Sequence, residues 1–182
     1  MRKSIIALAV FVLLLVALSA SSARADEIRG LSTSSAILGA ETWYCGALPG
    51  PGFHYIQYFL YYYADDLRGS DGKHVGGPPF SGYKAEVFAA VMRPIYISKL
   101  KFLGANLAWH AVIPVVYKHE ESDFFEDDLW GLGDIYFSPL ILCWHPSKTW
   151  HFAAALDIIA PTGDWDRDRI VNVGNNHWTF EP

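Results

Sequence analysis

After its first 25 residues, the chain lacks any hydrophobic run long enough to cross a bilayer as a helix, which needs about 20 consecutive apolar residues. The apolar stretch around residue 109 is interrupted by His110 and Pro114, and the stretch around residue 159 by Asp157 and Pro161. A bundle of transmembrane helices is therefore excluded. If the mature chain enters a membrane, it does so as β-strands, because only helices and closed barrels satisfy the backbone hydrogen bonds in lipid.

Cysteine is also scarce. The chain has two cysteines, Cys45 in an N-terminal loop region and Cys143 inside an expected strand. They do not form the paired framework that is typical of small exported domains. A single bridge between them stays open as an alternative but is not favoured. Because no cysteine lies at the export cleavage site, a lipoprotein is not expected.

Basic residues are few once the export signal is removed. The first 25 residues are typical of a secretory signal peptide, with Arg2 and Lys3 before an apolar run of 14 residues, Ile5–Leu18, and a small-x-small cleavage pattern at Ala23–Ala25. Cleavage leaves 11 of the 14 basic residues against all 19 acidic ones, a net charge of −8. This balance argues against nucleic acid as a partner. We expect residues 1–25 to be the signal peptide and residues 26–182 to be one domain.

Alternating polarity predicts five strands and the opening of a sixth. Each complete segment has about the 9–11 residues, or slightly more, that a tilted strand needs to cross a bilayer. In the last complete segment one face is apolar and the other carries His151 and Asp157, as expected for a barrel. The same period also describes a soluble β-sandwich, so alternation alone does not decide. The expected strands are Phe53–Tyr63, Tyr83–Tyr96, Asn106–Tyr117, Leu132–His145 and Trp150–Ala160, with His177–Phe180 opening the sixth.

The connections between these strands alternate in length. Residues 64–82, 118–131 and 161–176 are long polar stretches, whereas residues 97–105 and 146–149 are short. With the N-terminus in the periplasm, every long loop faces outside the cell, which is typical of outer-membrane barrels. The aromatic content of 15% agrees with this, since Tyr and Trp favour membrane–water interfaces. We therefore expect an all-β, antiparallel up-and-down transmembrane β-barrel in the outer membrane of a Gram-negative bacterium.

Six short stretches of the mature chain match one known family in the right order. Each is weak alone, but together they are specific: Leu48–Gly52, Tyr61–Asp65, Gly131–Asp134, Trp150–Phe152, Pro161–Asp164 and Asn175–Pro182. Through them the chain closely resembles the family called putative meta-pathway of phenol degradation proteins. The resemblance implies an outer-membrane β-barrel that is associated with aromatic degradation and is proposed to help small hydrophobic aromatic compounds enter the cell.

The number of strands departs from the pattern of that family. Closed bacterial barrels have an even number of strands, eight at the least, and the family continues beyond the Trp178–Pro182 motif with further strands. The present sequence predicts about five to six. We therefore expect residues 26–182 to be the N-terminal part of a barrel that is incomplete.

The mixed faces of the expected strands supply candidate lumen-lining residues. Charged and histidine side chains there would polarise a channel and orient a phenolic hydroxyl, or would pair with Lys84 and one another in a wet interior. Aromatic side chains there would stack on an aromatic solute, or would fill the barrel or join an aromatic girdle. The candidates are Tyr61, Glu86, Phe88, His110, Asp134, Tyr136, His151 and Asp157.

No catalytic, cofactor or metal site is expected from the sequence. A Gly-x-Ser-x-Gly nucleophile motif does not occur. His110, His145 and His151 lie on different segments, without the His-x-x-x-His spacing of a paired metal site. An enzyme is therefore not expected.

These patterns together favour a passive outer-membrane channel or transporter for small hydrophobic aromatic compounds. Its partners would be outer-membrane lipid and these solutes, and it would need no cofactor. Two alternatives stay open: a structural or adhesive outer-membrane barrel without transport, and a soluble periplasmic β-sheet protein that binds a small apolar ligand.

Overall fold

The computed structural model describes residues 46–69 and 71–181, so the predicted signal peptide and Cys45 lie outside the described residues. The described chain is all β, and it contains no helix long and apolar enough to cross a membrane. Seven strands form one antiparallel sheet: β1 (Gly52–Ala64), β2 (Lys84–Phe102), β3 (Ala105–Glu121), β4 (Glu126–Leu132), β5 (Ile135–Trp144), β6 (Phe152–Ala160) and β7 (Thr179–Glu181).

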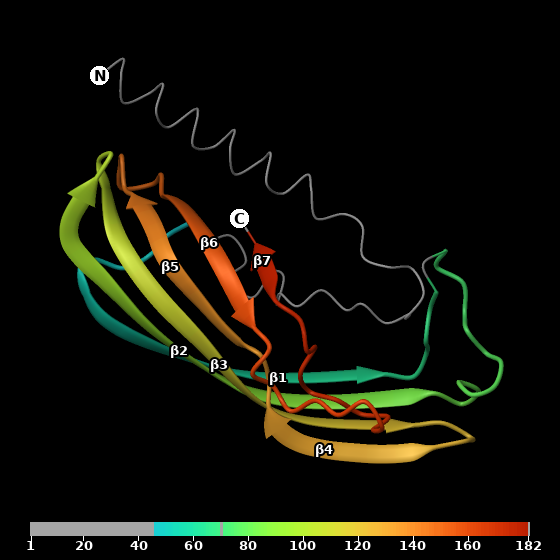
Figure 1. Ribbon diagram of the computed structural model, residues 1–182. Helices are drawn as coiled ribbons and strands as arrows, with labels where there is room; N and C mark the ends of the chain where they lie inside the picture. The colour runs from blue at the N-terminus through green and yellow to red at the C-terminus, as the bar shows by residue number, and fades with distance from the viewer. Residues whose placement is uncertain (1–45, 70, 182) are drawn as a thin grey trace.

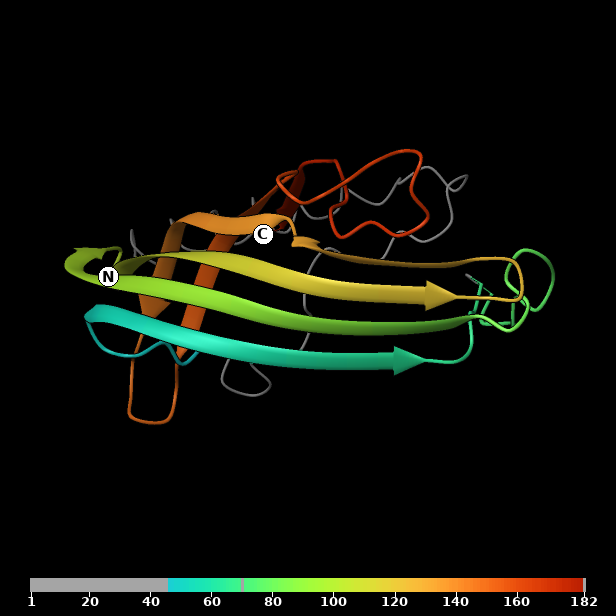
Figure 2. The same cartoon turned by 90° about the horizontal axis from the view of Figure 1, so that it is seen from below.

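The sheet is open, and its strands follow the order of the chain. The order across it is β1-β2-β3-β5-β6-β7, and β4 pairs with one half of β3. β1 and β7 form the two edges and are not paired with each other within the described residues. The predicted antiparallel all-β architecture is confirmed, but the sheet does not close into a barrel. Figures 1 and 2 show β1, β2 and β3 as long adjacent strands, from which β5 and β6 turn away as the sheet curves.

The hairpin between β2 and β3 is longer than predicted. Instead of a loop over residues 97–105, β2 continues to Phe102 and β3 begins at Ala105, which pairs with it. The turn consists of Leu103 and Gly104, with φ of 50° and 82°. Two residues at positive φ match the twist of a tight hairpin. The sequence signal is weak here because leucine stands where asparagine or aspartate is usual.

The predicted long acidic loop over residues 118–131 is wrong. β4 runs antiparallel to the end of β3, from the Val115–Leu132 pair to the Glu121–Glu126 pair. Only residues 122–125 form the turn, in which the Ser122 hydroxyl accepts hydrogen bonds from two backbone N–H groups. Acidic residues can stay solvated on an edge hairpin, so their number does not exclude strand structure. The predicted strand Leu132–His145 is correspondingly divided at residues 133 and 134.

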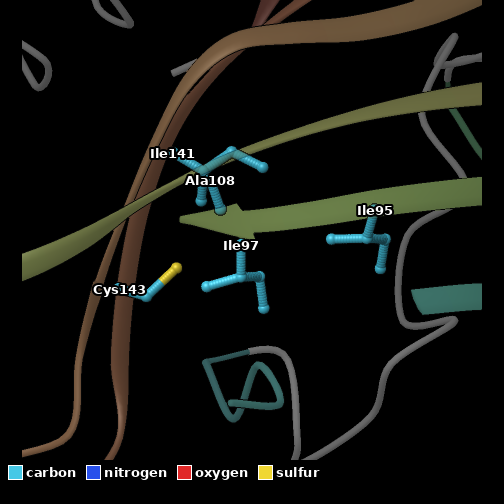
Figure 3. Close-up of a cluster of buried hydrophobic side chains, with 5 residues drawn as sticks. All are labelled: Ile95, Ile97, Ala108, Ile141 and Cys143. Atoms are coloured by element: carbon cyan, nitrogen blue, oxygen red, sulfur yellow. The ribbon is translucent and has the colours of Figure 1, made fainter. Parts of the chain in front are cut away.

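The two faces of the sheet differ in burial. We call inner the face that carries a buried apolar cluster from β2, β3 and β5, shown in Figure 3, and outer the opposite face. Leu48 from the preceding segment packs against this cluster. Cys143 belongs to the cluster and is a free, buried thiol. The cluster consists of Ile95, Ile97, Ala108, Ile141 and Cys143.

Candidate functional site

An apolar cavity of about 250 Å³ lies on the inner face. Strands β1, β2 and β3 contribute side chains such as Leu60, Ala89 and Val116, and Tyr136 of β5 adds an aromatic wall. Asp134, Val173 and Asn175 come from the β4–β5 junction and the segment between β6 and β7. A site with mainly aliphatic walls and two aromatic rings, those of Tyr62 and Tyr136, suits a small apolar molecule.

Asp134 holds the segment that covers this cavity. Its side chain is almost fully buried, at 4% exposure. The Gly163 N–H donates to Oδ1 at 2.9 Å, and the Asn175 N–H donates to Oδ2 at 2.8 Å. Hydrogen bonds to a charged acceptor are among the stronger ones in proteins. Asp134 was predicted as a lumen-lining charge; it borders the cavity, and both its oxygens fix the covering backbone.

Two glycines let the covering segment fold tightly against this junction. A Cβ on Gly163 would lie 2.6 Å from the Gly174 Cα and 2.9 Å from the Asp134 backbone nitrogen. A Cβ on Gly174 would lie 2.6 Å from the Gly163 carbonyl carbon. Only glycine permits such an approach of backbone to backbone. Three of the motifs noted in the sequence, Gly131–Asp134, Pro161–Asp164 and the start of Asn175–Pro182, therefore meet at one place.

A polar network lies beside the cavity on the inner face. Arg93 donates through Nη1 to the Tyr58 hydroxyl at 3.1 Å, and through Nε and Nη2 to His110 Nδ1 at 3.2 and 3.1 Å. His110 Nε2 lies 2.8 Å from Ser138 Oγ and 3.2 Å from Asp157 Oδ1, and Ser138 also donates to Asp157. The predicted candidates His110 and Asp157 are thus brought together.

The hydrogen bonds determine which nitrogen of His110 carries the proton. A guanidinium group only donates, so Nδ1 of His110 must accept and Nε2 bears the hydrogen. Ser138 therefore cannot pass its proton to His110, because the nitrogen facing it is already protonated. The Ser–His–Asp proximity lacks the proton acceptor that a nucleophilic serine needs. The network serves to satisfy buried polar groups.

His151 lies apart from these groups. It lies just before β6, and its Nδ1 is 2.8 Å from Nδ1 of His145, with the two rings at 66° to each other. His151 is therefore not part of the cavity or of the polar network around His110.

The remaining three candidates lie on the outer face. Leu60 and Tyr62 border the cavity, so Tyr61 between them points to the opposite face. Val87 and Ala89 border it likewise, which puts Glu86 and Phe88 on the outer side. The Tyr61 hydroxyl donates to Glu86 at 2.8 Å. The sequence assigned the mixed face of β2 inward, whereas the small apolar residues of β2 are the ones that face the cavity.

Aromatic residues form two cross-strand rows on the outer face. In the upper row Tyr61 pairs with Phe88, Phe88 with Tyr117, and Tyr117 with Trp130, whose rings lie 5.0 Å apart. The lower row consists of Phe53, Tyr96 and Trp109, of which the last two stack at 6.1 Å. The rows are eight residues apart on each of β1, β2 and β3, about 26 Å at roughly 3.3 Å per residue.

Between the rows the outer face carries no charged residue on β1, β2 or β3. Phe59 is the most exposed large hydrophobic residue described, at 72%. Ionisable residues begin directly beyond the upper row, with Glu86 and His119 paired across β2 and β3. The outer residues between the rows are Tyr55, Gln57, Phe59, Ala90, Met92, Pro94, Ala111, Ile113 and Val115.

The sequence analysis missed Tyr58, Arg93 and Ser138. One signal could have found Arg93: it is a lone cation in the apolar middle of β2, between Val91 and Ile95. A charge in such a strand predicts buried partners on neighbouring strands. The partners themselves depend on strand register, which the sequence did not supply.

Comparison with known proteins agrees with the resemblance noted in the sequence. The family model described as Putative MetA-pathway of phenol degradation matches residues 64–182. No curated protein and no solved structure matches the chain. The matched region contains the six strands β2 to β7 and covers well over half of the chain, so the chain belongs to the Putative MetA-pathway of phenol degradation family.

Proposed function

We propose that the described sheet is part of the wall of an outer-membrane channel that admits small hydrophobic aromatic compounds. The outer face would contact lipid and the inner face would line the solute path. The observation that carries this proposal is the pair of aromatic rows about 26 Å apart, with an uncharged exposed band between them. Outer-membrane barrels have an apolar band about 25 Å tall between two aromatic girdles, although strand tilt would shorten the present band to about 20 Å.

The cavity supports the choice of solute. Its volume of about 250 Å³ exceeds the roughly 150 Å³ of an apolar cavity that accepts benzene, and it is below the range for drug-sized ligands. Aliphatic walls and the ring of Tyr136 would hold one substituted aromatic ring by burial and ring contact. The family description, which names phenol degradation, agrees with a solute of this class.

The transport step in this proposal makes and breaks no covalent bond. Ser138 faces a protonated nitrogen of His110, so the network offers no activated nucleophile. The solute would move between weak sites down its own concentration gradient. The polar network would lie at one side of the cavity and provide hydrogen-bonding groups for a phenolic hydroxyl.

Membrane insertion can be tested by substituting lysine for each of two exposed phenylalanines, one inside the uncharged band and one outside it. Phe59 lies between the aromatic rows, whereas Phe102 lies at the end of β2, six residues beyond Tyr96, and both are exposed. A lysine in the apolar band costs up to about 2–4 kcal/mol at its centre and about 0–1 kcal/mol at its margins. Phe59→Lys should reduce the yield of folded protein in lipid vesicles by at least tenfold, whereas Phe102→Lys should leave it unchanged.

Vesicle insertion is read from heat-modifiable migration on a gel, in which the unheated, folded protein and the heated, unfolded protein run as separate bands. Equal behaviour of Phe59→Lys and Phe102→Lys, with both proteins soluble without detergent, would refute the membrane assignment. That result would favour the soluble ligand-binding alternative instead.

Solute passage can be tested by filling the cavity. Val116 of β3 borders the cavity, and its neighbour Val115 lies on the outer face. Val116→Phe should lower the entry of phenol into protein-containing vesicles, and Val115→Phe is the matched control with the same added volume. If neither substitution alters phenol entry while both proteins insert, the structural-barrel alternative is favoured.

A further inference from the structure

The tip of the β3–β4 hairpin brings like charges together. The register sets Glu121 of β3 directly opposite Glu126 of β4, and the preceding pair is Glu120 opposite Asp127. Like charges at directly opposite positions destabilise a β-ladder. Each of these pairs therefore needs positive charge or hydrogen-bond donors nearby.

The Glu120–Asp127 pair, which lies on the inner face, has such partners within the fold. Lys118 Nζ lies 2.7 Å from Glu120, and the Val171 N–H donates to Asp127 at 3.2 Å. The Glu121–Glu126 pair, which lies on the outer face and is called the outer pair, has its negative charge compensated differently. Lys84 binds only Oε1 of Glu121, at 2.6 Å. The second oxygen, Oε2, is directed to the imidazole of His119, whose Nε2 lies 3.8 Å away.

The outer pair and this histidine together make a set of metal-binding atoms. One nitrogen of His119 and one oxygen each of Glu121 and Glu126 lie within 4.8 Å of one another. Ligands bound to zinc at about 2.1 Å in a tetrahedral site are roughly 3.4 Å apart, so small side-chain rotations would complete the contacts. Two ligands come from β3 and one from β4, on backbones already fixed by the ladder.

The chemistry of the three atoms limits the ion. Magnesium and calcium prefer sites made of oxygen alone, whereas an imidazole nitrogen with carboxylates suits first-row transition metals. Three protein ligands leave one tetrahedral position for water or for an external group. We propose that His119, Glu121 and Glu126 bind a divalent transition-metal ion of the zinc class at the tip of the β3–β4 hairpin.

The site lies on the outer face beyond the upper aromatic row, since His119 is two residues past Tyr117. Binding would link β3 to β4 and remove the repulsion between the two facing glutamates. Metal binding by the isolated protein does not depend on solute transport or on membrane insertion. The two proposals can therefore fail separately.

The test is a titration of the tag-free full chain, folded in detergent micelles, with Zn²⁺ in competition with a chromophoric chelator. We expect one ion per chain, with at least tenfold weaker binding for His119→Gln and for Glu126→Gln. His54→Gln is the matched control, because His54 is half-buried, as His119 is, but lies on β1 near the opposite end of the sheet. Mg²⁺ at the same concentration should not displace Zn²⁺.

Lys84→Met supplies a readout that a merely structural role would not give. Removal of the lysine frees Oε1 of Glu121, so Zn²⁺ should bind more tightly, although the hairpin loses an ion pair. Should His119→Gln fail to fold, the imidazole resonances of His119 in the unaltered protein should shift on Zn²⁺ addition, and those of His54 should not. Unchanged affinity in folded His119→Gln, weaker binding in Lys84→Met, or a shift confined to His145 and His151 would overturn the proposal.

Discussion

Substitution of Asp134 should destabilise the protein more than substitution of an exposed acidic residue in the segment that covers the cavity. The two oxygens of the Asp134 carboxylate accept backbone hydrogen bonds from Gly163 and Asn175, and the group is almost fully buried. A hydrogen bond to a charged group contributes about 1.5–3 kcal/mol. Asp134→Asn keeps one acceptor oxygen and turns an NH₂ group toward the other N–H, so it should destabilise the protein by about 1.5–3 kcal/mol.

Asp134→Ala removes both acceptors and should cost about 3–6 kcal/mol, somewhat less if the segment detaches and its N–H groups reach water. The measurement is equilibrium urea unfolding in detergent micelles, followed by tryptophan fluorescence. Hydrogen exchange of the Gly163 and Asn175 amides gives a local readout. In Asp134→Asn one of the two amides should exchange much faster, and in Asp134→Ala both should.

Asp168→Asn is the control, since Asp168 is an exposed residue in the same segment. Its unfolding free energy should stay within about 0.5 kcal/mol of the unaltered protein. If Asp134→Asn also stays within that range and both amides keep their protection, the carboxylate does not hold the segment and the reasoning fails.

Two further predictions concern the long loops. Gly163→Ala should destabilise the protein by about 1–3 kcal/mol, because its Cβ would meet the Gly174 backbone at 2.6 Å; Gly77→Ala, whose Cβ meets nothing within 4 Å, should change the urea midpoint little. The hydrogen bond from His74 keeps the pKa of Asp66 below its ordinary value. His74→Ala should therefore raise the pKa of Asp66, as a carboxyl NMR titration would measure. The depressed pKa stabilises the folded loop above the unfolded pKa of about 3.9, and this stabilisation is lost as pH falls through the folded pKa. An unchanged Asp66 titration in His74→Ala would contradict this assignment.

The sequence predicted the strand class well, because alternation is a local property. The expected strands Phe53–Tyr63 and Asn106–Tyr117 lie within β1 and β3. The prediction of strands failed where a run of acidic residues was interpreted as a loop. Residues 118–131 are mostly strand, since the edge hairpin keeps its carboxylates in solvent or beside a cation.

Site residues were harder to predict because they depend on register. Asp134 and Tyr136 border the cavity, but no local pattern indicates that Asp134 binds the backbone of a segment 29 residues away. Arg93 and His110 come together because β2 and β3 pair through a two-residue turn that was not predicted. The same register creates the His119 set, whose members lie on two strands and have no recognisable spacing.

The interruption between β4 and β5 has a consequence for how the cavity can open. Pro114 of β3 faces the break and has no N–H to donate, while its carbonyl accepts from Gly133 at 2.9 Å. The covering segment fills the gap, because the Asp164 backbone N–H donates to the Leu132 carbonyl at 2.8 Å and the Ile135 N–H donates to the Thr162 hydroxyl at 3.0 Å. The start of the covering segment is thus tied by hydrogen bonds to both sides of this break. Opening the cavity on this side would require these hydrogen bonds to break, so the segment forms part of the cavity wall.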